Sequence, residues 1–102
     1  ADNLMRNQQA SAAVEVLQTL TKKRPTDVDL WYLLAEAHGL ANDVIGVHEA
    51  RAEYFVLIGN FDQAIKQLGY ATPLARDNFG LTARLRQRID TIHNMRREQR
   101  RS

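Results

Sequence analysis

The chain has 102 residues, of which 44% are apolar and 25% are charged, and it contains five Gly, two Pro and no Cys. This composition is that of one globular domain and excludes a disulfide-stapled scaffold, a collagen-like chain and an intrinsically disordered chain. A transmembrane helix needs about 20 consecutive apolar residues, and the sequence has no such run. The net charge of +2 is unevenly distributed: residues 1–75 carry six Lys/Arg against nine Asp/Glu, whereas residues 76–102 carry eight Arg against three acids.

Apolar residues recur at helical spacing along the whole chain, and no stretch alternates apolar and polar residues as a half-buried strand does. The sequence therefore predicts an all-α fold. The first helix is expected over residues 10–23, ending before Pro25, and the second is expected to begin after a Thr26 or Asp27 cap and to run to about Leu40. Their predicted inward residues are Ala13, Val16, Leu17 and Leu20, and then Trp31, Leu34, Ala35 and His38.

Three more helices are expected, over residues 44–58, over 61–71 and from residue 78 until the helix frays near Arg97. Asn42 or Asp43 caps the first of these, Gly59 supplies a left-handed residue after it, and Pro73 ends the next. We expect residues 1–10 to be a flexible or helical remnant of a larger protein, 11–93 the domain and 94–102 a basic tail. The predicted inward residues of these helices are Val47, Tyr54, Phe55, Ile58, Phe61, Ala64, Ile65, Leu68, Leu81, Leu85, Ile89 and Ile92.

Regular helices joined by short loops call for a search for internal repeats, and one is present. The spacing of Ala52, Phe55, Gly59, Phe61, Ala64, Leu68 and Ala71 matches the tetratricopeptide repeat, a helix-turn-helix unit of about 34 residues. A second register, which includes Leu17, Pro25, Trp31 and Ala35, lies half a repeat out of phase. The third helix therefore serves both units, and we expect an α-α superhelix of about five main helices.

Three strings, Leu34 to His38, His48 to Tyr54 and Gly59 to Ala64, closely resemble the C-terminal repeat region of bacterial periplasmic zinc metallopeptidases. The resemblance covers about residues 11–93 and excludes the catalytic domain of that family. It implies a periplasmic, noncatalytic domain that recruits proteins, with zinc bound in the absent catalytic domain. The implied partners are the outer-membrane β-barrel assembly machinery, outer-membrane substrate proteins and the chain's own protease domain.

The sequence predicts no catalytic residue, metal ligand or cofactor site in this chain. His48 and Glu49 begin an H-E-x-x-H zinc motif, but Ala52 stands where the second His ligand is required. His38 and His93 have no nucleophile or acid at a useful spacing. Glu49 and Glu53, one helical turn apart, are interpreted as surface charges.

A tetratricopeptide groove normally presents one face of the first helix of a unit. In the upstream register this face holds Asp29, Tyr32, Glu36, Gly39 and Leu40, and an extended peptide there could stack on Tyr32. Two alternatives stay open. Tyr32 could cover an edge of the core, and the half-repeat slip could instead place Glu49, Glu53 and Val56 on the concave wall.

Two other functions are compatible with the sequence, a generic peptide-binding scaffold and a binder of RNA or anionic membranes. The second rests on the arginines of the last helix, but these point in several directions, and no aromatic residues are interleaved with them for base stacking. Charged capping of a terminal repeat explains them more simply, so no nucleic-acid partner is predicted. These arginines are Arg84, Arg86, Arg88, Arg96, Arg97, Arg100 and Arg101.

Overall fold

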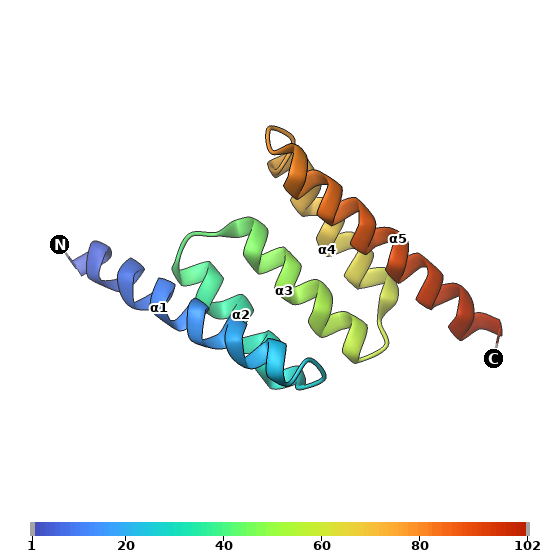
Figure 1. Cartoon of the computed structure of the whole chain (residues 1–102), viewed down its shortest axis with the longest axis horizontal. Helices are drawn as coiled ribbons and strands as arrows, with labels where there is room; N and C mark the ends of the chain where they lie inside the picture. Colours follow the sequence, from blue (N-terminus) through green and yellow to red (C-terminus); the bar gives the residue numbers. More distant parts are fainter. Residues whose placement is uncertain (1, 102) are drawn as a thin grey trace.

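The computed structural model describes residues 2–101, with side chains from residue 8 onward. Within that range the chain is helical, with short connections and no strand, which confirms the predicted all-α fold (Figure 1). None of the described helices is both long enough and apolar enough to span a bilayer. The helices are α1 (Asp2–Lys23), α2 (Val28–Leu40), α3 (Val44–Leu57), α4 (Phe61–Leu74) and α5 (Phe79–Arg101).

Each helix after α1 begins behind an Asp or Asn whose side chain accepts a hydrogen bond from a backbone N–H of the first turn. Asp27 accepts from Asp29, Asp43 from Gly46, Asn60 from Gln63 and Asn78 from Leu81, at 2.9 to 3.3 Å. These bonds satisfy donors that have no partner within the helix. The connection after α3 uses Gly59 at φ +83°, as predicted, and the one after α2 uses Asn42 at φ 62°.

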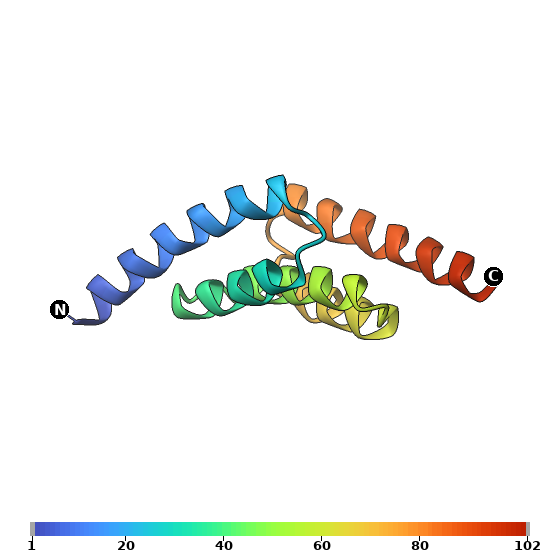
Figure 2. The same ribbon diagram turned by 90° about the horizontal axis from the view of Figure 1, so that it is seen from below.

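The five helices form two layers. In Figure 2, α2, α3 and α4 lie side by side in one layer, while α1 and α5 lie in the other. The helices that pack closely are consecutive ones: α1 on α2, α2 on α3, α3 on α4 and α4 on α5. The result is an elongated α-α stack of 53 × 31 × 19 Å.

Small residues form much of the core. Ala52, Ala64 and Ala71 are fully buried, and they pack with Leu68, Leu85 and Ile92 between α3, α4 and α5. A second cluster, built on Leu34, Ala35 and Ala50, joins α2 and α3 to α1. Alanine allows helix axes to approach closely, and α3 contributes alanines to both clusters. This helix therefore connects the two halves of the stack. The sharing of α3 follows from the two overlapping registers in the sequence.

The predicted inward face of α1 is right for Leu17 and wrong for Ala13 and Val16. Val16 is 59% exposed and Ala13 is also exposed, whereas Ala10, Val14 and Thr21 join Leu17 on the side that meets α2. The predicted inward position of Ile58 is wrong too, because this residue ends α3 and is 50% exposed.

Three helix ends also differ from those predicted. α1 begins at Asp2 rather than at residue 10, and α5 continues to Arg101 rather than fraying near Arg97. α4 continues through Pro73, because a proline in the last turn removes only its own donor while Ala75 N–H still bonds to Ala71 O at 3.2 Å.

Candidate partner-binding grooves

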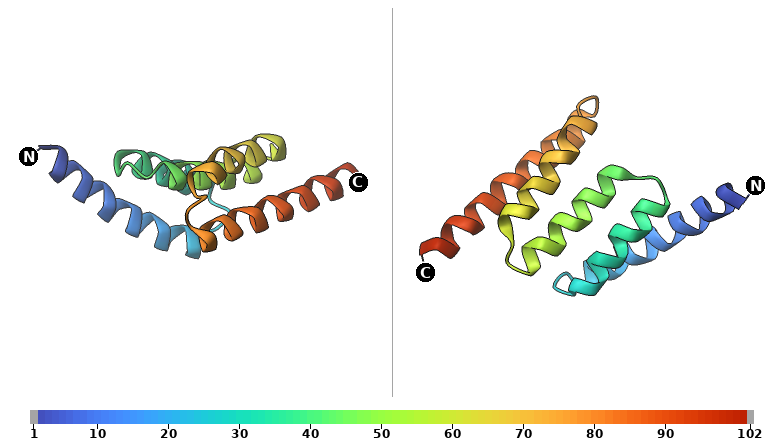
Figure 3. Two further views of the ribbon diagram at one scale, coloured as in Figure 1. Left: turned by 90° about the horizontal axis from the view of Figure 1, so that it is seen from above. Right: turned by 180° about the vertical axis from the view of Figure 1, so that it is seen from behind.

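Two hollows open on opposite sides of α3. One lies between α2 and α3 on the face that points away from α1 and α5, the side seen in the right-hand view of Figure 3. The other opens toward α1 and α5. Opposite faces of α3 line the two hollows. Val47, Arg51 and Tyr54 line the first, and Gly46, Glu49 and Glu53 line the second.

The first hollow, here called the aromatic groove, has a volume of about 300 Å³. The rings of Tyr32 and Tyr54 lie 6.1 Å apart between centroids, and Tyr54 contacts Phe55 edge to face at 5.5 Å. Such tilted contacts hold aromatic rings in place and leave their remaining faces free for a ligand. The groove is lined by Tyr32, Ala35, Glu36 and Gly39 of α2 and by Val47, Arg51, Tyr54 and Phe55 of α3.

Two opposite charges belong to the lining of the aromatic groove. Glu36 of α2 and Arg51 of α3 are both exposed, and neither forms an ion pair with a described side chain. A site with an apolar floor and a few unpaired polar groups can bind an apolar side chain and orient the polar groups that flank it.

The second hollow, here called the inter-hairpin groove, has a volume of about 490 Å³. Its floor includes Gly46 and Ala50 of α3 together with Trp31 and Leu34 of α2. The indole N–H of Trp31 donates to Pro25 O at 2.9 Å, which fixes the ring. The remaining lining residues are Gln18, Thr21 and Lys22 of α1, His38 of α2, Glu49 and Glu53 of α3 and Arg84 of α5.

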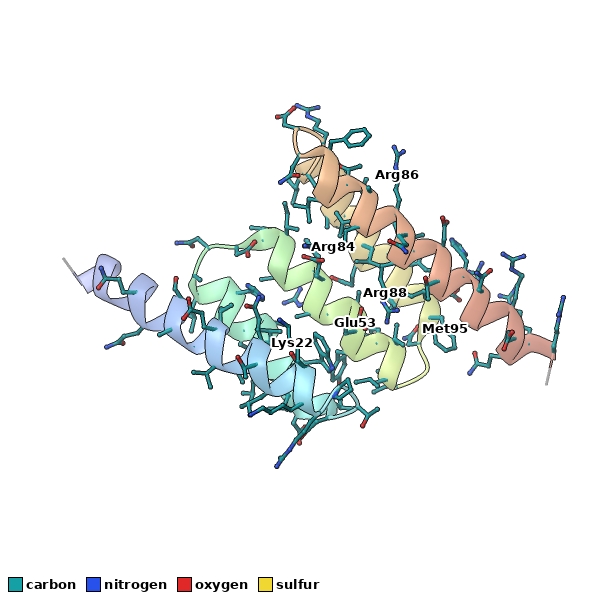
Figure 4. The ribbon with its side chains drawn as sticks, viewed as in Figure 1. Lys22, Glu53, Arg84, Arg86, Arg88 and Met95 are labelled. Atoms are coloured by element: carbon teal, nitrogen blue, oxygen red, sulfur yellow. The ribbon has the colours of Figure 1, made fainter. Side chains whose placement is uncertain are left out.

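One side of the inter-hairpin groove is closed by two ion pairs between α3 and α5. Arg84 donates to both carboxylate oxygens of Glu49, at 3.2 and 2.9 Å, and Arg88 donates in the same way to Glu53, at 2.7 and 2.6 Å. Figure 4 shows these arginines pointing toward α3, whereas Arg86 points away from it. Glu49 and Glu53 are therefore partly buried internal ion-pair partners, and the interpretation as simple surface charges is wrong.

The structure separates the predicted groove residues. Tyr32 and Glu36 line the aromatic groove with Gly39, while Glu49 and Glu53 line the inter-hairpin groove on the other face. The two remaining predicted residues, Asp29 and Leu40, line neither.

Val56, the third residue of the alternative wall, packs against the buried core and lines neither groove. Arg51 was not predicted to line a groove, and Val47 and Tyr54, predicted to point inward, line the aromatic groove instead. Phe55 packs against the buried core as predicted and also lines this groove. Helical periodicity marks Val47, Tyr54 and Phe55 as one apolar face but does not show that the described helices leave part of this face uncovered.

The three histidines lie in separate environments. His38 is buried, with Nδ1 3.3 Å from an Asp43 carboxylate oxygen. His48 Nδ1 is 2.8 Å from the Gln67 amide oxygen, and His93 Nδ1 is 3.0 Å from a guanidinium nitrogen of Arg96. Among the described side chains, no group of three or more His, Asp or Glu lies close enough together to hold a metal ion.

One carboxyl group outside both grooves has a perturbed pKa. Asp62 of α4 accepts a hydrogen bond from Arg96 of α5 at 2.8 Å, and this bond lowers the pKa of Asp62 below its usual range. The charges of Arg100 and Lys66 act in the same direction. The interaction links α4 to the C-terminal half of α5.

Comparison with known proteins shows a similarity to part of a curated protein. The chain is 29% identical over 92 residues, 90% of its length, to a curated protein of Vibrio cholerae serotype O1 named "Putative beta-barrel assembly-enhancing protease". The match spans 19% of the length of that relative. No protein-family model and no solved structure matches the chain. The chain is thus similar to a small part of a protein whose name connects it with proteolysis and β-barrel assembly.

Proposed function

We propose that this chain is a noncatalytic protein-binding domain that recruits partners to a periplasmic metalloprotease acting in the assembly and quality control of outer-membrane β-barrel proteins. The similarity to the Vibrio protein supports the connection with β-barrel assembly. The tetratricopeptide-like spacing and the two-layered helical stack support a binding role rather than a catalytic one.

The aromatic groove is the observation that carries this proposal. Tyr32 is 54% exposed although its ring contacts Tyr54, so a large aromatic surface stays open to solvent on a rigid helical frame. Aromatic side chains are enriched among residues that dominate binding energy, and a preformed groove loses little entropy when a partner binds. We assign to this groove an extended segment of a partner protein that inserts an apolar side chain between α2 and α3.

Site-specific photocrosslinking in the full-length protein in living cells tests the proposal. A photoreactive residue at Glu36, at the edge of the aromatic groove, is expected to capture a component of the β-barrel assembly machinery or an outer-membrane substrate protein. Adding Tyr32→Ala should reduce the capture severalfold. Tyr70→Ala is the matched control, because Tyr70 is equally exposed, at 56%, but lies on α4 outside the groove. Capture unaffected by Tyr32→Ala would place the binding site elsewhere.

The alternative function as an RNA or anionic-membrane binder has less support. Arg88 and Arg96 are engaged with Glu53 and Asp62, which reduces the number of guanidinium groups free for phosphates. A phosphate-binding surface would also lose affinity steeply between 50 and 200 mM salt. Binding of an oligonucleotide or of anionic vesicles with this salt dependence, unchanged by Tyr32→Ala, would favour the alternative.

A further inference from the structure

The two-layered arrangement leaves one position in the smaller layer open. Three helices, α2, α3 and α4, form one layer, but only α1 and α5 lie over it, at its two ends (Figure 2). In the described part of the chain α1 and α5 do not pack against each other, and the inter-hairpin groove lies between them above α3. The groove is thus bounded by a helix on each side and by α2 and α3 below.

The floor of this groove is closed by side chains of the chain itself. Gly46 and Ala50 of α3 are buried, Gly46 beneath the His38 ring, and Leu34 of α2 is only 4% exposed. Trp31 is half-buried, so part of its ring stays exposed beside these residues, and the hydrogen bond from the indole of Trp31 to Pro25 holds the ring in place. An apolar side chain of an incoming helix would meet the exposed part of this ring.

The charges that remain free in the groove are positive. Both glutamates of the lining, Glu49 and Glu53, are already neutralised by bidentate arginine pairs. Lys22, on the opposite side, forms no ion pair with any described side chain and lies in the space between α1 and α5 (Figure 4). Arg84 is 64% exposed and uses only two of its five N–H donors on Glu49, so it can still bind a second carboxylate.

We propose that the inter-hairpin groove binds an amphipathic α-helix of a partner protein, with an apolar side chain of that helix against Trp31 and an acidic side chain at Lys22 and Arg84. Helix-in-groove recognition of this kind uses apolar anchors spaced three or four residues apart, with charge fixing the register. This site is independent of the aromatic groove, because the two lie on opposite faces of α3.

The test uses the whole chain and three synthetic peptides labelled with fluorescein. The first is a helix-forming peptide with Leu and Ala on one face and Glu at the flanks of that face. The second has Lys in place of each flanking Glu, and the third is the first with a central Pro that breaks the helix. Fluorescence anisotropy measures the affinity of each peptide for the wild type and for Lys22→Glu. Lys23→Glu is the matched control, because this neighbouring exposed lysine does not line the groove.

The wild type is expected to bind the Glu peptide more tightly than the Lys peptide and to bind the Pro peptide weakly. Lys22→Glu should weaken the Glu peptide about fivefold and improve the Lys peptide, as expected for one partly exposed ion pair, while Lys23→Glu changes neither. Equal effects of Lys22→Glu and Lys23→Glu, equal binding of the Pro peptide, or no binding of the Glu peptide would overturn the proposal. Self-association of the chain that blocks the groove would also overturn it.

Tyr32→Ala separates this proposal from the previous one. It should leave the affinity for the Glu peptide unchanged, because Tyr32 lines the aromatic groove only. Loss of peptide binding in Tyr32→Ala but not in Lys22→Glu would assign the peptide to the aromatic groove.

Discussion

Arg88 of α5 donates hydrogen bonds to both carboxylate oxygens of Glu53 of α3, at 2.7 and 2.6 Å, although the two residues are 35 positions apart in the sequence. One turn earlier on both helices, Arg84 and Glu49 repeat the arrangement. The side chains of the Arg88–Glu53 pair are only 32% and 23% exposed, whereas Arg84 is 64% exposed. The two pairs set the position of α5 along α3, although the close backbone packing of α5 is against α4.

The Arg88–Glu53 pair is expected to contribute more to stability than the Arg84–Glu49 pair. A double-mutant cycle with Arg88→Ala and Glu53→Ala should give a coupling free energy of about 1–2 kcal/mol, because less solvent screens this pair, while the equivalent cycle for Arg84 and Glu49 should give about 0.5 kcal/mol. Urea denaturation of the single and double variants measures both. Equal coupling free energies in the two cycles would show that the difference in burial does not affect the strength of the two ion pairs.

The sequence could not predict these two ion pairs between α3 and α5. It showed that Glu49 and Glu53 lie one turn apart, and that Arg84 and Arg88 do too, but only the tertiary structure brings the two helices together. The helix caps at Asp27 and Asp43 were predictable because they depend on neighbouring residues alone.

The register of α1 was not predictable for a different reason. Small and apolar residues occur on more than one side of this helix, so no single stripe dominates, and contact with α2 selects Val14 rather than Val16. The aromatic groove was only half predicted. Tyr32 and Glu36 followed from the repeat register, but Tyr54 and Phe55 have the spacing of core residues, and the sequence does not tell which apolar face lacks a covering helix.

Gly46→Ala is expected to destabilise the chain by about 1–3 kcal/mol. A Cβ atom at this position would overlap Nδ1 of the buried His38 and lie 2.6 Å from its Cγ, so the imidazole ring would have to move. Gly69→Ala is the matched control on α4, because a Cβ there meets nothing within 4 Å. Alanine is the better helix former, so the control should gain up to about 1 kcal/mol. Thermal denaturation followed by circular dichroism compares the two, and a Gly46→Ala variant as stable as the Gly69→Ala variant would refute the contact.

Arg96→Ala should raise the pKa of Asp62 toward the ordinary value of about 4. The hydrogen bond from Arg96 lowers this pKa in the folded chain, so the pair stabilises the folded state above the unfolded pKa. That contribution is lost as the pH falls through the lowered folded pKa, below about pH 4. NMR titration of the Asp62 carboxyl carbon measures the shift. Arg97→Ala is the control, because Arg97 bonds to Asn94 instead, and an equal effect of both variants would rule out the specific hydrogen bond.

Ala52→Leu and Ala64→Leu should each destabilise the stack by about 1–3 kcal/mol, because larger side chains at a close helix contact force the helices apart. Both alanines have no exposed surface, and they belong to the same buried cluster between α3 and α4. Ala83→Leu, on an exposed position of α5, introduces the same side chain without this constraint and should leave the free energy of unfolding nearly unchanged. Urea denaturation measures all three. The two core variants could instead unfold at the same urea concentration as Ala83→Leu. In that case the small size of the alanines would not be what allows α3 to pack against α4, and the close packing that shapes both grooves would need another physical cause.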